Sequence, residues 1–408
     1  MDAVLQRSST MPVVTMIGGG QLARMTHQAA IALGQCLRVL ASSETDPAAQ
    51  VSAEVVIGSH DDLDDLRRAA AGANALTFDH EGVPLDHLVA LENEGVTVLP
   101  PSKALRFAQD KLAMRTRLSE LGLPVPDFVD LSGDPAAARE RLRDFGARHG
   151  WQIVLKAVRG GYDGRGVWLL DDEQQALTVF DGADDATRLM AEAKVSMRRE
   201  LSALIARSPF GQGAAWPVVE TIQRHGQCAV VLAPAPDLPA EVAEAAQQMA
   251  LRLADELGAV GVMAMELFET TDGELVVNEL AMRPHNSGHW TMDGAVTSQF
   301  EQHLRAVLDY PLGATDVLAG PVVMANVLGA GEAPAMSMDE RVHHLMGRMP
   351  QARIHLYGKA ERPDRKIGHV NIVGTPGASI ADVRERAELA ATWLSTAVWT
   401  DGWDAHDD

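Results

Sequence analysis

Residues 275–289 of this chain are LVVNELAMRPHNSGH, an apolar run that leads directly into a carboxylate, two amides, a guanidinium and two imidazoles. Burying such groups without partners would cost about 1–3 kcal/mol each, so they either face solvent or line a site. A second carboxylate, Glu266, lies in the apolar run at 261–268, and the turn Thr-Thr-Asp-Gly at 270–273 predicts a hairpin between the two runs. The hairpin would place Glu266 and Glu279 on neighbouring strands, where two carboxylates favour a hard cation such as Mg2+ over two solvent-facing acids.

Length and composition restrict the class of protein. The 408 residues are enough for about three domains, and the 46% hydrophobic content is typical of a soluble globular chain. No apolar run reaches the ~18 residues of a membrane span. Two cysteines, Cys36 and Cys228, indicate a reduced, cytoplasmic compartment rather than a disulfide framework. The net charge of −21 argues against a nucleic-acid partner. An anionic substrate would therefore need a local basic cluster, and residues 357–366 supply Lys359, Arg362, Arg365 and Lys366.

The order of apolar and helical patterns predicts the domains. Residues 12–110 alternate strand-like and helix-like segments, which is typical of a doubly wound parallel sheet. The expected strands are 13–17, 37–40, 53–57, 75–78 and 96–99, and the expected helices are 22–32, 63–71 and 85–94. One further helix is expected at 102–121, across the boundary between the first region and a mixed α+β central region that covers 111–315. A small C-terminal domain is expected at 316–397, with strands at 322–328, 354–357 and 369–373 and a helix at 381–397. An acidic tail follows at 398–408, and a flexible tail is expected at 1–11.

Two glycine-rich turns differ in what they predict. Residues 18–23, Gly-Gly-Gly-Gln-Leu-Ala, fit the Gly-x-Gly-x-x-Gly/Ala pattern of dinucleotide sites. Any tight strand-to-helix turn favours glycine, so a structural turn or a generic anion site is an equal alternative there. Residues 156–167 are more specific, because Lys156 ends a strand and four glycines follow within residues 160–166. Exposed backbone N–H groups beside lysine and arginine suit a polyphosphate, whereas the alternative is a flexible hairpin tip.

Taken together, these residues resemble the ATP-grasp superfamily and, within it, the family of N5-carboxyaminoimidazole ribonucleotide synthases, over about residues 12–395. The matching motifs are residues 18–22, 77–84, 156 with 160–166, 278–291 and 357–370. The resemblance implies a pre-ATP-grasp domain with a doubly wound parallel sheet, an ATP-grasp centre and a small C-terminal domain, usually in a homodimer. It also implies carboxylation of 5-aminoimidazole ribonucleotide with bicarbonate and ATP, through carboxyphosphate, in de novo purine biosynthesis, with Mg2+ or Mn2+ as the metal.

Three rival functions account for less of the chain. Another ATP-grasp ligase, such as formate-dependent glycinamide ribonucleotide transformylase, also activates a one-carbon acid, but the string at 283–289 favours the carboxylase. A nicotinamide-dependent dehydrogenase would account for residues 18–23 alone. A non-catalytic nucleotide sensor is the third alternative, and the intact set of phosphate and metal ligands favours an enzyme over it.

The resemblance also implies a role for each site residue. ATP would be contacted by Lys111, Lys156, Gly161, Tyr162, Asp163, Gly164, Arg165, Gly166, Val167, Glu192, Ala193, Lys194, Val195, Glu200, Gln223, Asn278 and Glu279. The ribonucleotide would be held by Gln21, Leu22, Glu81, Arg283, His285, Asn286, Lys359, Arg365 and Lys366, of which Arg283, His285 and Lys359 are candidate catalytic residues. Glu266 and Glu279 would hold the metal. The chain departs from the pattern at Gln223, where many relatives carry His and where His225 stands two places away, and at Met282, where Pro is common.

Overall fold

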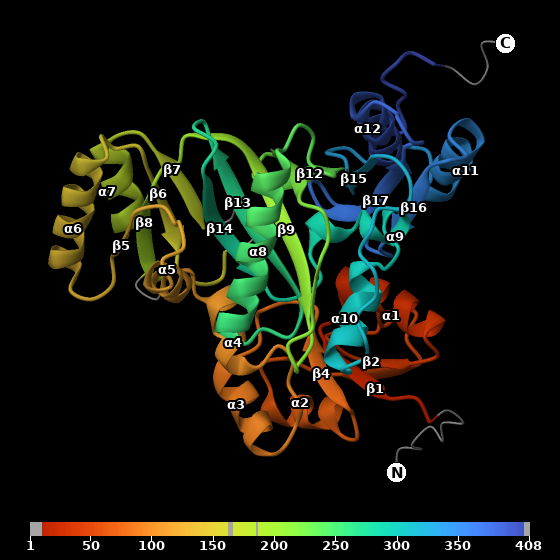
Figure 1. The fold of residues 1–408 in the computed structure, drawn as a ribbon, viewed down its shortest axis with the longest axis horizontal. Coiled ribbons are helices and arrows are strands. Elements are labelled where there is room, and N and C mark those ends of the chain that lie inside the picture. Colours follow the sequence, from red (N-terminus) through yellow and green to blue (C-terminus); the bar gives the residue numbers. More distant parts are fainter. Residues whose placement is uncertain (1–9, 162–165, 185–186, 404–408) are drawn as a thin grey trace.

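The computed structural model describes residues 10–161, 166–184 and 187–403. Its strands form a parallel sheet near the N-terminus, a small antiparallel sheet, and a nine-stranded antiparallel sheet that continues into the C-terminal part of the chain (Figure 1). This combination of parallel and antiparallel sheets confirms the predicted α/β and α+β fold class.

The N-terminal sheet is doubly wound, as the sequence predicts. Its strand order is β3-β2-β1-β4, and every neighbouring pair is parallel. Its elements are β1 (Val13–Ile17), α1 (Gln21–Ala32), β2 (Cys36–Ala41), β3 (Glu54–Ile57), α2 (Leu63–Ala70), β4 (Ala75–Phe78) and α3 (Leu85–Asn93). Residues 96–99 do not form the expected fifth strand, because the described chain pairs there only through an isolated bridge between Leu76 and Val98. Pro100 and Pro101 follow at once, and without N–H groups they cannot extend the pairing.

The helix expected at 102–121 is broken at Asp110. The structure has two helices there, α4 (Ser102–Gln109) and α5 (Lys111–Glu120). Asp110 has extended dihedral angles (φ −126°, ψ 102°), and its carboxylate caps α5 by accepting the N–H of Ala113 at 2.9 Å. Lys111 donates its own N–H to the Val158 carbonyl at 2.9 Å. The break therefore places Lys111 at the start of a helix, beside the second glycine-rich turn.

The small antiparallel sheet has strand order β5-β8-β6-β7, and α6 and α7 lie beside it at the left of Figure 1. Its elements are β5 (Phe128–Asp130), α6 (Pro135–Arg148), β6 (Ile153–Ala157), β7 (Val167–Leu170), α7 (Glu173–Gly182) and β8 (Leu189–Ala193). Ile153 and Leu155 of β6 pack in one cluster with Leu142 and Phe145 of α6. Because side chains alternate along a strand, Lys156 lies on the opposite face, away from the helices.

The large sheet has strand order β14-β13-β9-β11-β12-β15-β17-β16, with β10 added beside β9. Its strands are β9 (Met197–Arg207), β10 (Gly213–Ala215), β11 (Val219–Arg224), β12 (Gln227–Ala233), β13 (Gly261–Thr270), β14 (Leu275–Ala281), β15 (Val322–Leu328), β16 (Arg353–Leu356) and β17 (Lys366–Val373). The remaining helices are α8 (Ala240–Leu257), the 3-10 turn η1 (Asn286–Gly288), α9 (Thr291–Gly294), α10 (Gln299–Val307), α11 (Met338–Arg348) and α12 (Ile380–Thr396). Because β12 pairs with β15, the sheet continues across residue 315, where the sequence suggested a domain boundary.

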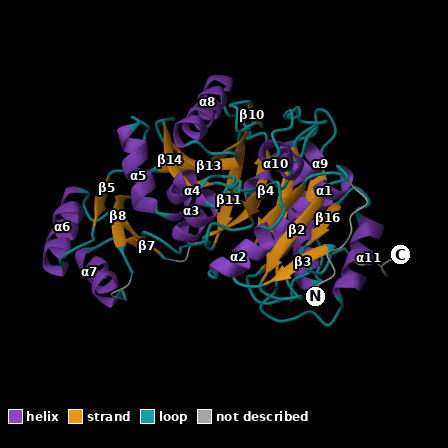
Figure 2. Ribbon diagram, turned by 90° about the horizontal axis from the view of Figure 1, so that it is seen from below, coloured by secondary structure: helices purple, strands orange, loops and turns teal. Residues whose placement is uncertain are grey.

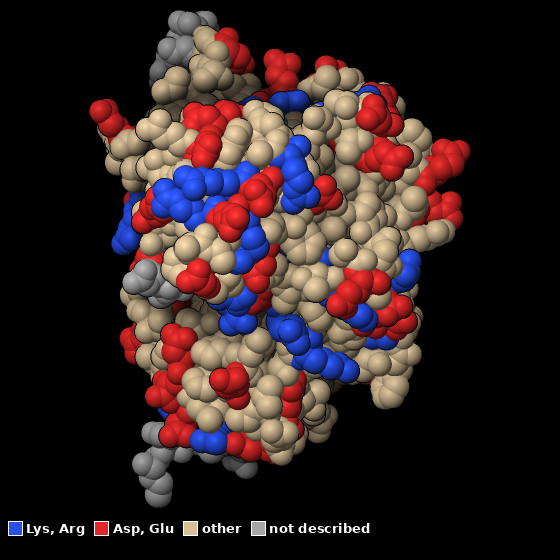
Figure 3. Space-filling view, turned by 90° about the vertical axis from the view of Figure 1, so that its left-hand side faces the viewer, with Lys and Arg blue, Asp and Glu red and all other residues tan. Residues whose placement is uncertain are grey.

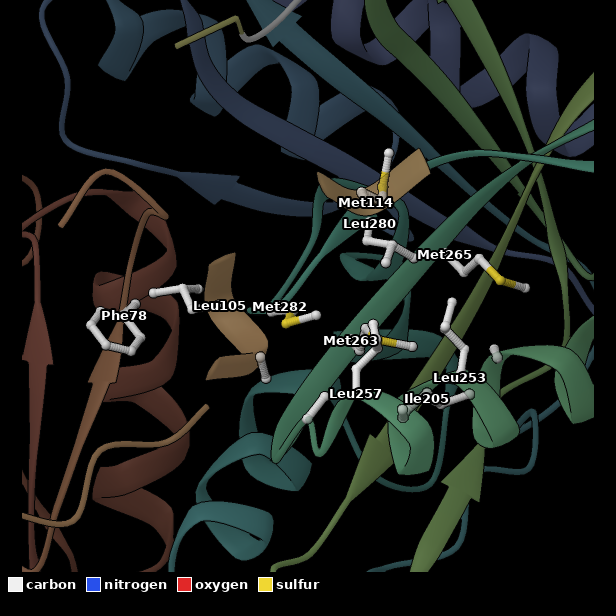
Figure 4. Packing of buried hydrophobic residues seen from close by; sticks show 14 of the residues in the cluster. Phe78, Leu105, Met114, Ile205, Leu253, Leu257, Met263, Met265, Leu280 and Met282 are labelled. Atoms are coloured by element: carbon white, nitrogen blue, oxygen red, sulfur yellow. The ribbon is translucent and has the colours of Figure 1, made fainter. Parts of the chain in front are cut away.

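One hydrophobic core joins the N-terminal sheet to the large sheet. It includes the side chains of β9 that face α8, and it continues into α4 and β4. Figure 4 shows the chain of contacts from Phe78 through Leu105 and Met282 to Met263 and Leu257. The view from below in Figure 2 places the small sheet with α6 and α7 at one end of the molecule, and the N-terminal sheet and α11 at the other.

Candidate active site

One face of the large sheet carries a group of polar side chains. Cross-strand partners lie on the same face, and Ser202 of β9 is paired with Glu266 of β13, which is paired with Glu279 of β14. The hairpin predicted from residues 270–273 is therefore confirmed. Burial, together with the charges of Glu279 and Glu200, raises the pKa of Glu266 to about 8. A carboxyl group crowded by other carboxylates is suited to a cation, which would relieve the repulsion.

The two lysines expected at the ATP phosphates are each paired with a carboxylate. Lys111 Nζ lies 2.6 Å from Glu279 Oε1. Lys156 Nζ lies 2.7 Å from Glu192 Oε2 and 3.3 Å from Asn278 Oδ1. Burial lowers the pKa of Lys156, and the charge of Glu192 opposes that shift. The structure thus brings together five of the residues that the resemblance assigns to ATP.

Arg115 belongs to this cluster but was not among the expected site residues. Its Nε and Nη2 donate to the two carboxylate oxygens of Glu192 at 2.7 and 3.2 Å, and both residues are buried. Burial alone would raise the pKa of Glu192, but the positive charges of Arg115 and Lys156 lower it. A signal was present in the sequence, since Arg115 follows Lys111 by four positions and therefore lies on the same side of α5.

The second glycine-rich turn connects β6 to β7. Gly160 and Gly166 have φ angles of 80° and 71°, a region that side chains rarely adopt, so the backbone itself requires glycine there. Gly161 and Val167 lie in the described part of the turn. The other expected ATP contacts in this turn lie outside the described residues: Tyr162, Asp163, Gly164 and Arg165.

The segment expected beside the adenine links β8 to β9. The N–H of Ala193 donates to the Asp127 carbonyl at 2.8 Å, and the N–H of Lys194 donates to the Gln152 carbonyl at 2.9 Å. These two donors are therefore engaged within the protein. A purine edge would have to use Val195 or the carbonyl groups of the segment.

Glu200 and Gln223 are paired on neighbouring strands. Gln223 Nε2 donates to Glu200 Oε2 at 3.0 Å, and burial raises the pKa of Glu200. His225 is exposed in the β11–β12 turn, with a φ angle of 51°. The geometry therefore favours Gln223, rather than His225, as the residue that acts with Glu200.

The chain after β14 folds back across the polar face of its own sheet. His285 Nε2 lies 3.3 Å from Glu266 Oε1, and His285 Nδ1 lies 2.9 Å from the Ser287 hydroxyl. The Ser287 hydroxyl lies in turn 2.8 Å from that of Ser202. Burial, followed by the charge of Arg283, lowers the pKa of His285 to about 3. Neither serine was among the expected site residues, although Ser287 lies within the string at 283–289; Ser202 lies in β9, outside the matching motifs.

Asn286 and His289, in the segment that crosses the sheet after β14, contact strands of the C-terminal part of the chain. Asn286 and Asn326 of β15 exchange two side-chain hydrogen bonds, at 3.1 and 2.8 Å. Asn371 of β17 donates to the His289 carbonyl at 3.2 Å. Asn286, which the resemblance assigns to the ribonucleotide, is thus also a structural contact between η1 and β15.

The residues expected at the ribonucleotide meet where the N-terminal and C-terminal parts of the chain come together. Arg283 Nε donates to Glu81 Oε2 at 2.6 Å, and the N–H of Met282 donates to the other Glu81 oxygen at 3.3 Å. Lys359, from the loop between β16 and β17, donates to Gln21 Oε1 at the start of α1. Residues that are more than 300 positions apart in the sequence are therefore neighbours here.

Three further expected residues differ in their placement. Lys366 begins β17, and its charge is close enough to lower the pKa of Glu266, opposing the larger effect of burial. Arg365 donates to the Ala360 carbonyl at 3.3 Å within its own loop. Leu22 is only 6% exposed and packs in the α1 core, so only its backbone could reach a ligand.

The Asp79 side chain caps the N-terminus of α1. Its carboxylate accepts the N–H groups of Gly20 at 3.0 Å and Ala23 at 2.8 Å. A Cβ atom on Gly20 would lie 2.2 Å from this carboxylate. A protein carboxylate thus already occupies the position where a pyrophosphate would bind. This geometry favours the structural-turn alternative for residues 18–23, and the anion-site alternative stays a prediction.

The outer surface carries mixed charge. Figure 3 shows Lys and Arg in short bands bordered by Asp and Glu on the side that carries α6 and α7. Ion pairs such as Arg139 with Asp181 and Arg143 with Glu173 join these two helices. Among the helices that the structure describes, none is long and apolar enough to cross a membrane.

Three family models match consecutive parts of the chain. A ribonucleotide synthetase preATP-grasp domain matches residues 11–109, an ATP-grasp domain matches residues 116–300, and a phosphoribosylaminoimidazole carboxylase C-terminal domain matches residues 322–384. The three matches agree with the expected order of a pre-ATP-grasp domain, an ATP-grasp centre and a C-terminal domain.

Known proteins are similar over nearly the whole length. The N5-carboxyaminoimidazole ribonucleotide synthase of Mycobacterium tuberculosis is 63% identical over 97% of this chain and 90% of its own. The crystal structure of the synthetase from Thermus thermophilus has a TM-score of 0.81 and 36% identity, and covers 96% of this chain and 100% of its own. The synthase of Aspergillus clavatus, crystallised with ADP and 5-aminoimidazole ribonucleotide, has a TM-score of 0.84 and 27% identity, and covers 94% of this chain and 98% of its own.

Proposed function

This chain belongs to the family of N5-carboxyaminoimidazole ribonucleotide synthases, which are ATP-grasp ligases, and we propose that it carboxylates 5-aminoimidazole ribonucleotide with bicarbonate and ATP. The observation that carries the proposal is the arrangement of charge on one sheet face. Lys111 and Lys156 lie beside Glu279 and Asn278 at one end. At the other end Arg283, from the segment after β14, is paired with Glu81. A site with basic side chains at two separate places suits two phosphorylated substrates.

The reaction begins with bicarbonate attacking the γ-phosphate of ATP, which forms carboxyphosphate and releases ADP. The exocyclic amine of the ribonucleotide then attacks the carboxyl carbon, or the CO2 released from it, and phosphate leaves as the carbamate forms. Lys111 and Lys156 would neutralise charge on the transferred phosphoryl group. In the described chain both ammonium groups already have carboxylate partners, so ATP would have to replace Glu279 as the partner of Lys111.

The described residues fit a magnesium ion at Glu266 and Glu279. Their ligand atoms are oxygens, and burial with the neighbouring carboxylates raises the pKa of Glu266, so a bound cation would stabilise its charged form. Within the described residues, no group of three or more His, Cys, Asp or Glu could hold a metal alone, so phosphate or water oxygens would complete the shell. When bound, Mg2+ (or Mn2+) would neutralise charge that develops on the phosphoryl group.

The base that removes the amine proton is better assigned to the released phosphate than to His285. Both ring nitrogens of His285 lie within hydrogen-bonding distance of protein groups, Glu266 and Ser287. We therefore assign to His285 the orientation of Glu266. Arg283, Lys359, Arg365 and Lys366 would hold the ribonucleotide, with Glu81 fixing the Arg283 guanidinium.

Release of ADP tests the proposal directly. We expect ADP only when 5-aminoimidazole ribonucleotide, bicarbonate and ATP are all present. Turnover with formate and glycinamide ribonucleotide instead would support the transformylase alternative, which the matched relatives and C-terminal domain do not favour. A change in NAD(P)H absorbance would support a dehydrogenase, and nucleotide binding without turnover would indicate a sensor. The homodimer and the cytoplasmic location stay predictions, and analytical ultracentrifugation would measure the first.

A further inference from the structure

The loop between β16 and β17, residues 357–365, is termed here the cationic loop. Within residues 357–366 the chain has four basic side chains, Lys359, Arg362, Arg365 and Lys366. Like charges so close together repel one another, and a flexible loop would spread them apart. Binding one phosphate requires the opposite arrangement, with several of these groups held toward one point. Some part of the protein must therefore fix the shape of this loop.

The two ends of the cationic loop are fixed by neighbouring backbone and side-chain groups. At the first end, Gln50 of the N-terminal domain donates to the Gly358 carbonyl at 3.0 Å. At the second end, Gly329 donates its N–H to the Arg365 carbonyl at 2.9 Å and accepts the N–H of Asp364 at 3.0 Å. A Cβ atom at Gly329 would lie 2.1 Å from the Arg362 carbonyl oxygen, so this approach requires glycine.

Glu361, near the middle of the cationic loop, is held by a buried arginine. Its Oε1 lies 2.6 Å from Nη2 of Arg341 in α11. The Arg341 side chain is 2% exposed, and its Nη1 donates to the carbonyls of Leu394 and Ser395 in the last turn of α12 at 2.5 and 3.3 Å. The Trp393 indole donates to the Arg341 carbonyl at 2.8 Å. The guanidinium is therefore rigidly placed by two helices, and only one of its edges reaches outward, to the loop.

We propose that the Arg341–Glu361 ion pair positions the cationic loop for the phosphate of the ribonucleotide. The pair fixes a residue that lies between the basic side chains, so it restrains the backbone that carries them before the ligand arrives. A loop that is ordered in advance loses less conformational entropy on binding than one that orders around the ligand. The inference rests on the proposed function, because it takes this loop to be the ribonucleotide end of the site. Neither Arg341 nor Glu361 is assigned to touch substrate, and both are positioning residues.

Glu361→Ala is the test variant, because Arg341 keeps its bonds to α12 in it. The matched control is Asp401→Ala. Asp401 pairs with Arg348, the second arginine of α11, at Nη1–Oδ1 3.1 Å, and contacts no residue of the cationic loop in the described structure. Glu361→Gln keeps the hydrogen-bond acceptor and should give an intermediate result. Two measurements are made on each variant: steady-state kinetics with each substrate varied, and hydrogen exchange of residues 357–366.

We expect Glu361→Ala to raise the KM for 5-aminoimidazole ribonucleotide about fivefold or more, while kcat and the KM for ATP change by less than about twofold. Exchange in residues 357–366 should become faster in Glu361→Ala and stay unchanged in Asp401→Ala. A variant that merely loses stability would lower the amount of active enzyme and leave KM in place. The inference is overturned if the ribonucleotide KM stays at the wild-type value, or if exchange in the loop is unaltered. Wild-type enzyme without ribonucleotide-dependent ADP release would overturn the proposed function as well, so the two failures are distinguishable.

Discussion

Glu279→Gln should abolish turnover while leaving the protein folded. The substitution keeps the size of the side chain and removes one negative charge from the pair with Glu266. It also removes the ionic partner of Lys111, which lies 2.6 Å away. If Glu279 holds a metal, the loss of about 3 kcal/mol of transition-state stabilisation would already reduce kcat about 100-fold.

The expected change in stability is small because the pair is partly exposed. The Glu279 side chain is 41% exposed, and solvent screens its attraction to Lys111. Ion pairs of this kind contribute about 0–1 kcal/mol, which for a large domain corresponds to at most about 4 °C in Tm. Glu192→Gln is the matched comparison, since the same chemical change there breaks a buried pair with Arg115 and Lys156. Breaking a buried pair costs about 3–5 kcal/mol, so this variant should melt at least about 6 °C lower.

The assay combines ADP release across a Mg2+ titration with thermal melting of the same samples. Near-normal turnover of Glu279→Gln at ordinary Mg2+ would refute the metal assignment. A fall in Tm as large as that of Glu192→Gln would refute the view that the loss of activity is chemical rather than structural.

Three further predictions concern other parts of the molecule. Lys359→Ala should raise the ribonucleotide KM about tenfold, because a charge-assisted phosphate contact contributes about 1.5–3 kcal/mol, and should leave the ATP KM unchanged; kinetics with each substrate varied separates the two. Asp79→Ala should lower the free energy of unfolding by about 1–2 kcal/mol through loss of the α1 cap, measured by urea denaturation, whereas an unchanged midpoint would contradict the capping role. Burial lowers the pKa of His303 to about 3 from its usual 6.5, so the unfolded chain binds a proton that the folded chain does not, and each pH unit from 6.5 down toward 3 should cost about 1.4 kcal/mol of stability. His303→Gln should reduce that slope in denaturation curves measured between pH 6.5 and 4.

Local patterns in the sequence were sufficient for the parts of the fold that local chemistry decides. The turn at 270–273 predicted the hairpin that puts Glu266 and Glu279 on neighbouring strands. Their direct pairing depends on a register shift between Glu266 and Leu267, which the turn does not predict. The alternating apolar segments predicted the parallel sheet. The break at Asp110 was missed, although its capping bond to Ala113 is local, because the contact of Lys111 with Val158 comes from a part of the chain more than 40 residues later.

The residues of the site were predictable only where they belong to a recognisable sequence motif. The pair of Lys359 with Gln21 joins residues from opposite ends of the chain, and no spacing rule connects them. Asp79 shows the reverse case, in which a glycine-rich turn has the pattern of an anion site but the fold supplies its own carboxylate. Arg341 and Glu361 could not be paired from the sequence, because a surface acid and a helical arginine are individually ordinary.

The polar residues that follow β14 are numerous because they face a polar sheet. His285, Ser287 and Asn286 each contact a polar side chain on a different strand, namely Glu266, Ser202 and Asn326. These contacts offset the cost of burying the groups, which a loop over an apolar face would not recover. They also fix the loop that presents Arg283. The same sheet face therefore supplies the carboxylates at the nucleotide end and holds the loop at the ribonucleotide end, so the separation of the two ends is set by strand spacing rather than by a flexible connection.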